Sequence, residues 1–422
     1  MVLALCIPFV KMIIIILILG RTTMILFKNC RLIGELTEGY DKEFADILVN
    51  DKDKIEAIAT PGELSEDNVK VVDVKGMTVL PGFFDLHCHL FLTGLDFKEL
   101  CQKNIIDTCT DSYAFAREYL KQGYTTLREA GSPYNIPAGL EKAASKGIIN
   151  IPQIISSGLI LTPTENGNDT FSTIYREVDS PYEVRKAVRE QFDKGNQVIK
   201  YMVTGAYLNE SGNPGDQIAL EDELREAVKI AELKNSYVMG HAHGAEGIKA
   251  GIRAGLRTIE HGSFIDEEGI QMLKDRSDST WLVPTAAIGI ACLDDDGDTL
   301  SEDAMEKAQK YEKAEKDAVN SAYNAGLKLG FGSDIDYANL VKHPGMEFYA
   351  RTDWFDFKYI DILLQATKYS AEIAGLDHCK GTIKVGKNAE LVVIDGKPEE
   401  DIYVMKNMPV YVYYNGELIE NR

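Results

Sequence analysis

The chain is short of positive charge and of paired cysteines. Acidic residues number 66 against 45 Lys and Arg, so the formal net charge is −21. Such a surface would repel a phosphate backbone, and we expect no nucleic-acid partner. The seven cysteines are scattered and form no Cys-x-x-Cys pair, as is typical of reduced packing residues in a cytoplasmic protein. No low-complexity tract interrupts the 422 residues, which favours one large domain with a smaller companion.

The first twenty residues are almost wholly apolar, interrupted by Lys11, and resemble a signal peptide or a short membrane anchor. No basic region precedes the apolar stretch, and no Ala-x-Ala cleavage site follows it. We therefore interpret residues 1–23 as a dispensable or misassigned extension, with translation starting at Met12 or Met24. This favours a cytoplasmic protein, and membrane anchoring or export is the alternative.

Histidine is also scarce, but its distribution is informative. Five of the seven histidines fall in three short segments, each following a β-like run: His87 and His89, His241 and His243, and His261. Because side chains alternate along a strand, His87 and His89 point to one side of a sheet, where two imidazoles can share a metal ion. A core role for scattered histidines is the simpler alternative, and clustering argues against it.

The middle of the chain repeats a pattern of strand, loop and helix. Helix-like stretches occupy residues 111–122, 181–194, 220–234, 244–254 and 304–325. Short apolar β-like runs alternate with them at residues 78–84, 125–128, 153–157, 197–203, 236–241, 257–261, 280–285 and 327–332. Eight such units predict an α/β fold with a parallel (β/α)8 TIM barrel over residues 81–379.

The two ends of the chain differ from the middle. Residues 24–80 and 380–422 contain short β-like pieces separated by turn residues. Neither segment has enough strands for a stable sheet alone. Together they predict one small β-sandwich domain formed from both chain ends.

Several motifs, taken in order, resemble the amidohydrolase superfamily, in particular its prolidase, arginine or lysine carboxypeptidase and imidazolonepropionase-related branch. The motifs are Pro81-Gly-x-x-Asp-x-His-x-His89, Lys200, His241-Ala-His-Gly244, Glu260-His-Gly262, Gly332-Ser-Asp334 and the closing segment 381–394. The resemblance implies two divalent ions, usually zinc. It places His87 and His89 on one ion, His241 and His261 on the other, and Asp334 on the first. Lys200 would bridge the two as a carbamate formed with carbon dioxide.

Elementary chemistry supports these roles. In a parallel barrel, reactive groups belong at the C-terminal ends of strands, where all six ligands are expected to lie. A protonated amine is a poor ligand, but a carbamate on Lys200 supplies an anionic oxygen bridge. Two metals would lower the pKa of a shared water and polarise the scissile carbonyl. Asp334 is then the expected proton carrier to the leaving amine.

Other candidates lie around this set. His243 shares a face with His241, so either can be the ligand; the resemblance favours His241 and leaves His243 as a catalytic or substrate-binding group. Tyr207 is a pocket candidate in the long loop 205–217, which with loop 161–179 is expected to set specificity. Arg128 is a candidate for substrate binding or for a buried salt bridge. His343 either contacts the substrate or lies in a surface turn.

Three hypotheses for function follow. The leading one is metal-dependent hydrolysis of an amide or peptide-like C–N bond in a small molecule, such as a dipeptide or N-acyl amino acid, by a homo-oligomeric enzyme. The second is an imidazolonepropionase-like cyclic amide hydrolase or deaminase, for which Glu246, three residues after His243, is the candidate proton shuttle. The third is a non-catalytic assembly protein, which would be expected to have lost ligands. The loop 162–168 lacks the Gly-Gly-His element associated with the carboxypeptidase-like relatives, and this weighs against removal of C-terminal Arg or Lys.

Overall fold

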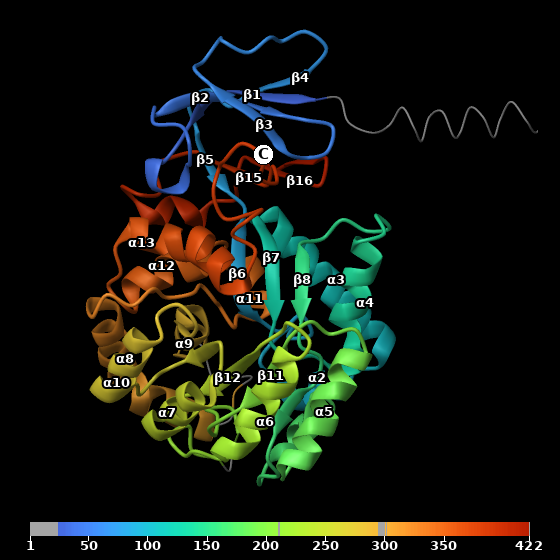
Figure 1. Cartoon of the computed structure of the whole chain (residues 1–422), viewed down its shortest axis with the longest axis vertical. Coiled ribbons are helices and arrows are strands. Elements are labelled where there is room, and N and C mark those ends of the chain that lie inside the picture. The colour runs from blue at the N-terminus through green and yellow to red at the C-terminus, as the bar shows by residue number, and fades with distance from the viewer. Residues whose placement is uncertain (1–23, 210–211, 294–299, 301, 422) are drawn as a thin grey trace, which may run out of the picture.

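The computed structural model describes residues 24–209, 212–293, 300 and 302–421. Two parts are visible in Figure 1: a sheet of strands from both chain ends, and a larger part in which parallel strands are surrounded by helices. Within the described residues, no helix is both long enough and apolar enough to cross a membrane. The expectation for residues 1–23 lies outside the described residues.

The end sheet has eight strands in the order β17-β16-β15-β5-β1-β2-β3, with β4 paired to β1. Antiparallel pairing of β15 with β5 joins the C-terminal segment to the N-terminal one, and Val392 lies opposite Leu80. A separate apolar cluster that includes Phe27, Ile47 and Val393 fills this part. The strands are β1 (Ile25–Arg31), β2 (Phe44–Val49), β3 (Ile55–Ala59), β4 (Lys70–Asp73), β5 (Thr78–Pro81), β15 (Leu391–Ile394), β16 (Tyr411–Tyr414) and β17 (Glu417–Glu420).

The larger part contains two parallel sheets, ordered β6-β7-β8 and β10-β9-β11-β12-β13-β14. Strands β6, β7, β11, β12, β13 and β14 are buried along their whole length, as expected of parallel strands covered on both faces. Their bounds are β6 (Phe83–Cys88), β7 (Tyr124–Glu129), β8 (Gln153–Ser156), β9 (Ile160–Thr162), β10 (Tyr175–Glu177), β11 (Ile199–Met202), β12 (Val238–Ala242), β13 (Thr258–His261) and β14 (Trp281–Val283).

Backbone hydrogen bonds connect the two parallel sheets at two places. The N–H of Gln197, just before β11, donates to the carbonyl of Ser156 in β8 at 2.8 Å. Elsewhere, segment 329–332 lies between β14 and β6: it forms a parallel bridge to β14, and the N–H of Leu86 donates to the carbonyl of Phe331 at 2.7 Å. The sequence predicts a strand at residues 327–332, and the structure has isolated pairings there instead.

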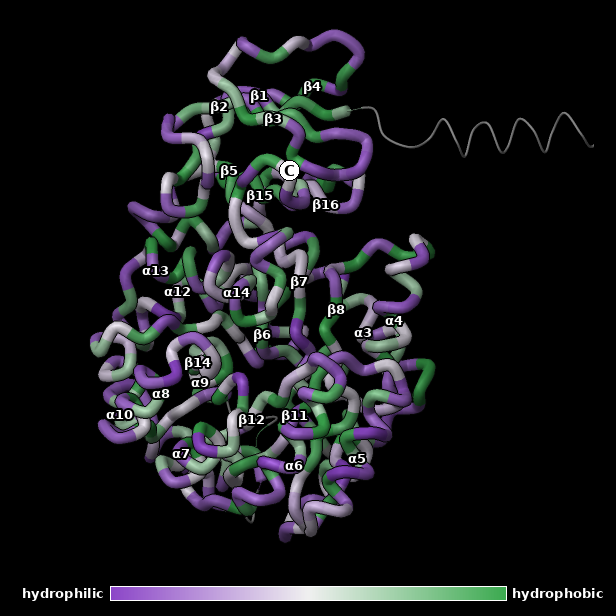
Figure 2. The backbone as a smooth tube through the Cα atoms, viewed as in Figure 1, coloured by the Kyte–Doolittle hydropathy of each residue, from purple (hydrophilic) through white to green (hydrophobic). Residues whose placement is uncertain are grey.

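Helices cover the outside of the parallel strands (Figure 1). Their sequences alternate between hydrophilic and hydrophobic residues, as the tubes of α5 and α6 show in Figure 2. The longer helices are α3 (Ile105–Lys121), α4 (Ile136–Ala144), α5 (Pro181–Asp193), α6 (Glu221–Glu232), α7 (Ala245–Ala254), α8 (Glu267–Asp275), α9 (Ala286–Leu293), α10 (Glu302–Asn324) and α12 (Met346–Asp353). The shorter ones are α2 (Phe97–Leu100), α11 (Tyr337–Lys342), α13 (Tyr359–Leu364), α14 (Ser370–Ala374), the 3-10 turns η1 (Gly34–Leu36), η2 (Pro133–Asn135), η3 (Asn168–Phe171) and η5 (Ile402–Lys406), and the π-helix η4 (Gln365–Tyr369).

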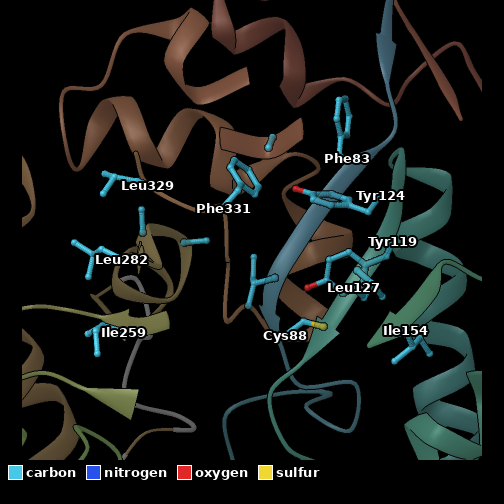
Figure 3. Packing of buried hydrophobic residues seen from close by; sticks show 14 of the residues in the cluster. Phe83, Cys88, Tyr119, Tyr124, Leu127, Ile154, Ile259, Leu282, Leu329 and Phe331 are labelled. Carbon is cyan, nitrogen blue, oxygen red and sulfur yellow. The ribbon is translucent and has the colours of Figure 1, made fainter. Parts of the chain in front are cut away.

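The main hydrophobic core lies between the parallel strands and these helices. Figure 3 shows Phe83, Tyr124 and Phe331 packed beside β6 and β7. Cys88, between the two histidines of its motif, is fully buried in the same cluster. Alternation along β6 therefore directs Cys88 into the packing and leaves His87 and His89 free to face another side.

Candidate active site

The six predicted ligands come from five different strand ends or the residues just after them. His87 lies in β6 with His89 immediately beyond it, and the others are Lys200 in β11, His241 in β12, His261 at the end of β13 and Asp334 just after segment 329–332. The strands of each sheet are parallel, so their carboxyl ends meet at one edge. The structure thus brings all six residues together, and it adds His243 and Glu260 to the same cluster.

A buried carboxylate orients the ring of His87. Its Nδ1 lies 2.8 Å from Oε2 of Glu260, whose other oxygen accepts a hydrogen bond from Arg128 at 2.8 Å. All three side chains are fully buried. A carboxylate on Nδ1 fixes the tautomer that leaves Nε2 free to bind a metal and increases its basicity. Sequence reasoning assigned no role to Glu260, although it precedes a predicted ligand.

The backbone at His261 explains how Glu260 and His261 both reach the site. Adjacent residues of an extended strand point to opposite faces, but His261 has φ 66°, in the left-handed region. Asp334 has the same feature, with φ 55°. Such conformations cost about 1 to 3 kcal/mol for residues other than glycine and concentrate at functional sites. The strand therefore bends at His261 and presents two neighbouring side chains to one cluster.

Hydrogen bonds fix the remaining ring orientations. His89 Nδ1 lies 2.7 Å from the Gly131 carbonyl, and His261 Nδ1 lies 2.9 Å from Thr285 Oγ1. In His241 the other ring nitrogen makes this hydrogen bond: its Nε2 lies 3.2 Å from the Gly205 carbonyl oxygen. A ring nitrogen that donates to a carbonyl leaves the other as an acceptor. His87 and His89 thus offer Nε2 to a metal, whereas His241 offers Nδ1.

Lys200 and Asp334 lie among these rings. The Nζ of Lys200 is 3.2 Å from His87 Nε2, and Asp334 Oδ1 is 3.5 Å from His89 Nε2 and 3.9 Å from His87 Nε2. Burial lowers the pKa of Lys200 below that of an ordinary lysine and raises the pKa of Asp334. A lowered amine pKa increases the fraction of neutral lysine, which is the form that reacts with carbon dioxide.

The chemistry of this donor set suits divalent metal ions. Burial lowers the pKa of His89 to about 4 and that of His243 to about 3, and it also lowers the pKa of His87, His241 and His261 well below the ordinary value of a histidine. Neutral imidazoles are metal ligands at pH 7, whereas protonated ones are not. Two sets of three ligand atoms lie within 4.8 Å of one another: His241, His243 and His261, and His87, His261 and Asp334.

An open cleft has two lobes, which meet at the cluster. The first lobe is lined by Tyr207, His243, Thr285, Ile288, Glu315 and Trp354. The second lobe is lined by Phe91, Phe97, Ile160, Phe171, Tyr175 and Met202. His241, His261 and Asp334 line both lobes. A bound molecule can therefore extend to either side of the metal-binding residues.

The two predicted specificity loops supply much of this lining. Loop 205–217 contributes Tyr207 to the first lobe, where its ring lies edge-on to His243 with centroids 4.7 Å apart. Loop 161–179 forms η3 and β10 and contributes Phe171 and Tyr175 to the second lobe. Burial raises the pKa of Tyr207, so its phenol stays protonated and can donate a hydrogen bond.

Two other candidates lie away from the cleft. The Nε of Arg128 donates to the Leu86 carbonyl at 2.7 Å, and its guanidinium pairs with Glu260 beneath His87. Arg128 is fully buried and lines neither lobe, which favours the buried salt bridge over substrate binding. His343 caps the end of α11 and is also outside the residues that line the lobes.

Strand ends that gather neutral histidines, a buried lysine and an aspartate define a class of metal-dependent hydrolase. The model of the Amidohydrolase family matches residues 78–419. The chain belongs to this family, which gives it a TIM-barrel-type fold and makes it a hydrolytic enzyme that acts on C–N bonds of small substrates.

Individual relatives agree with the family. The chain is 26% identical to ochratoxinase of Aspergillus niger over 376 residues, covering 81% of this chain and 75% of that protein. Among solved structures, it is similar to a prolidase in complex with N-methylphosphonate-L-proline, with 28% identity, a TM-score of 0.84 and coverage of 95% and 100% of the two chains. A Xaa-Pro dipeptidase with bound methionine has 26% identity, a TM-score of 0.82 and coverage of 94% and 100%.

Proposed function

We propose that the protein hydrolyses an amide bond of a small peptide-like molecule, a dipeptide or an N-acyl amino acid, at a centre of two divalent metal ions. The observation that carries the proposal is the position of Lys200, whose Nζ lies 3.2 Å from His87 Nε2 inside a cluster of neutral histidines. A protonated lysine repels metal ions and cannot bind them, whereas the carbamate of lysine is an anionic oxygen ligand.

In this proposal the ligands are His87, His89, Lys200, His241, His261 and Asp334. The two ions, with zinc as the expected metal, supply a Lewis acid for the scissile carbonyl and a lowered pKa for a water. Glu260 and Thr285 orient ligand rings through their second nitrogens. The proposed fold is a complete ring of eight strands, beside a sandwich made from the two chain ends.

Proton transfer is assigned to Asp334. Its carboxylate lies at the junction of the two lobes, where a scissile bond would be placed. From there it can accept a proton from the attacking water and deliver it to the leaving amine. His243 lies beside His241 and His261 and lines the first lobe, so its Nε2 can bind the substrate or take part in ligation.

The deaminase or cyclic amide hydrolase hypothesis receives less support. Its candidate proton shuttle, Glu246, lies in the first turn of α7 with a side chain 74% exposed, and pairs with Lys249 at 2.8 Å. It lines neither lobe of the cleft. Lys200 among the ligands also favours two metals over one.

The test is a substrate screen with purified protein loaded with zinc, and separately with manganese or cobalt. Linear dipeptides and N-acyl amino acids are compared with cyclic amides and amino-substituted heterocycles. Release of a free amine from linear amides, abolished by a chelator and restored by metal, supports the proposal. Ammonia release or ring opening without cleavage of any linear amide would contradict it.

A further inference from the structure

Besides Asp334, which lines both lobes, a second carboxyl group lies in the first lobe of the cleft. Glu315 projects from α10 into the lobe that also contains Tyr207 and His243. Its Oε1 accepts a hydrogen bond from Ser263 at 3.2 Å, and the Ser263 oxygen lies 2.8 Å from His243 Nδ1. With the serine proton directed to Glu315, the serine oxygen accepts from His243, which leaves Nε2 of that ring free.

Within the described residues, Glu315 forms no salt bridge. Its neighbour Lys316 contacts other groups, 2.6 Å from Glu312 and 4.0 Å from the centre of the Trp354 ring. Desolvation raises the pKa of Glu315 to about 7, and Lys316 only partly offsets this. The side chain is partly buried, so a positively charged group placed beside its carboxylate would be bound favourably.

The two lobes differ in one charged side chain. Among the described residues that line them, Lys200 is the one lysine or arginine, and it belongs to the proposed metal centre. The walls of both lobes are mainly apolar, and those of the second are aromatic, with Phe91 and Phe97. The first lobe differs from the second in containing the Glu315 carboxyl group.

We infer that Glu315 is a specificity-determining residue that binds the free α-ammonium group of an aminoacyl amide, whose apolar or aromatic amine portion occupies the second lobe. This rests on the proposed function and selects, from its two substrate classes, peptide-like amides with a free amino terminus over N-acyl amino acids. Placing the ammonium at Glu315 and the aromatic group in the second lobe sets the scissile bond over His261 and Asp334, which line both lobes.

The test compares two probes that differ only at the amino group: L-alanine anilide and N-acetyl-L-alanine anilide. We expect the zinc-loaded enzyme to favour the free amine by about 10- to 100-fold in kcat/KM, the scale of one hydrogen bond to a charged group. Glu315→Gln should remove this preference, mainly by raising KM for the free amine. Kinetics with the acetylated probe should stay within about 3-fold, because the amide side chain still accepts from Ser263.

The matched control is Glu312→Gln, which removes a carboxylate one turn earlier on α10 and should leave the preference intact. Glu315→Asp should retain part of it, and melting temperatures verify that each variant folds. As a readout independent of turnover, 2-phenylethylamine should raise the melting temperature of the wild type more than 3-phenylpropionate does, and this difference should disappear in Glu315→Gln.

Three outcomes would overturn the inference. If wild type cleaves the acetylated probe as well as the free amine, or if Glu315→Gln keeps the preference, the ammonium site is rejected and the hydrolase proposal stands. If the fully metal-loaded protein cleaves neither probe nor any other linear amide, both proposals fall together.

Discussion

His87 and His243 are positioned in contrasting ways within one cluster. His87 is backed by Glu260 and Arg128, which are fully buried and line neither lobe of the cleft. His243 is backed by Ser263, whose partner Glu315 lines the first lobe. A sealed network holds a ligand in one geometry, whereas a network that ends in the cleft can respond to what is bound there. We therefore expect the first network to serve the proposed metal centre and the second to serve the substrate.

The largest effect is expected at Lys200, in the middle of the cluster. Lys200→Ala should lose most activity and at least one of two metal ions, because the bridge between them is removed. A short carboxylic acid such as propionate should partly restore both. Metal content and turnover are measured for this variant and for a control, Lys328→Ala. Lys328 is a surface lysine whose side chain is 51% exposed. Normal turnover with two ions in Lys200→Ala would exclude the role.

Asp334 should show the next largest effect. Asp334→Asn keeps a ligand oxygen but cannot take a proton at neutral pH, so kcat should fall by about 10²-fold or more with a much smaller change in KM. The acidic limb of the pH–rate profile should change as well. Asp317→Asn, an exposed position on α10, is the control. Near-normal turnover with an unaltered profile would move the proton transfer to another group, His243 first.

Substitution of Glu260 tests the buried network that orients His87. Glu260→Gln should weaken metal binding by about 10- to 100-fold, the usual range for a partner that orients a ligand. Glu315→Gln should leave metal affinity unchanged, since its network ends in the cleft. Competition with a chromogenic chelator measures both. Equal metal affinities in the two variants would remove the distinction between the two networks.

Ser263 should give the smallest effect. Ser263→Ala removes one hydrogen bond to His243 and one to Glu315, so kcat/KM should fall about 2- to 15-fold, with metal content unchanged. Thr285→Val, which removes the hydroxyl beside His261, is the paired comparison and should lower metal affinity instead. A loss of metal in Ser263→Ala would show that His243 is a ligand.

The gathering of the proposed metal ligands was predictable, because the carboxyl ends of parallel strands lie at one edge of a sheet. Buried runs end at one edge, so His87, His89, Lys200 and His241 could be placed together from the pattern alone. Residues 327–332 were predicted as a strand, but Gly332 lies so close to β6 that an added Cβ would stand 2.7 Å from that of His87. Close packing of this kind depends on both neighbours and leaves no periodic signal in the sequence.

The roles that the sequence did not predict depend on contacts between distant segments. Glu260 and Arg128 are 132 positions apart, and Ser263 and Glu315 are 52 apart, so neither pair has a local pattern. Alternation along β13 also assigns Glu260 to the face opposite His261, and only the positive φ of His261 reverses this. The two roles of Arg128 stayed open for the same reason, because a strand arginine can point into the cleft or toward a distant carboxylate such as Glu260.

The most direct test of the account is metal content together with the state of Lys200. Active protein, incubated with ¹³C-labelled bicarbonate, is subjected to elemental analysis and carbon NMR. We expect about two divalent ions per chain, as for paired-metal hydrolases, and a carbamate signal that is absent from Lys200→Ala. One ion per chain in fully active protein, without a carbamate signal, would contradict the binuclear centre.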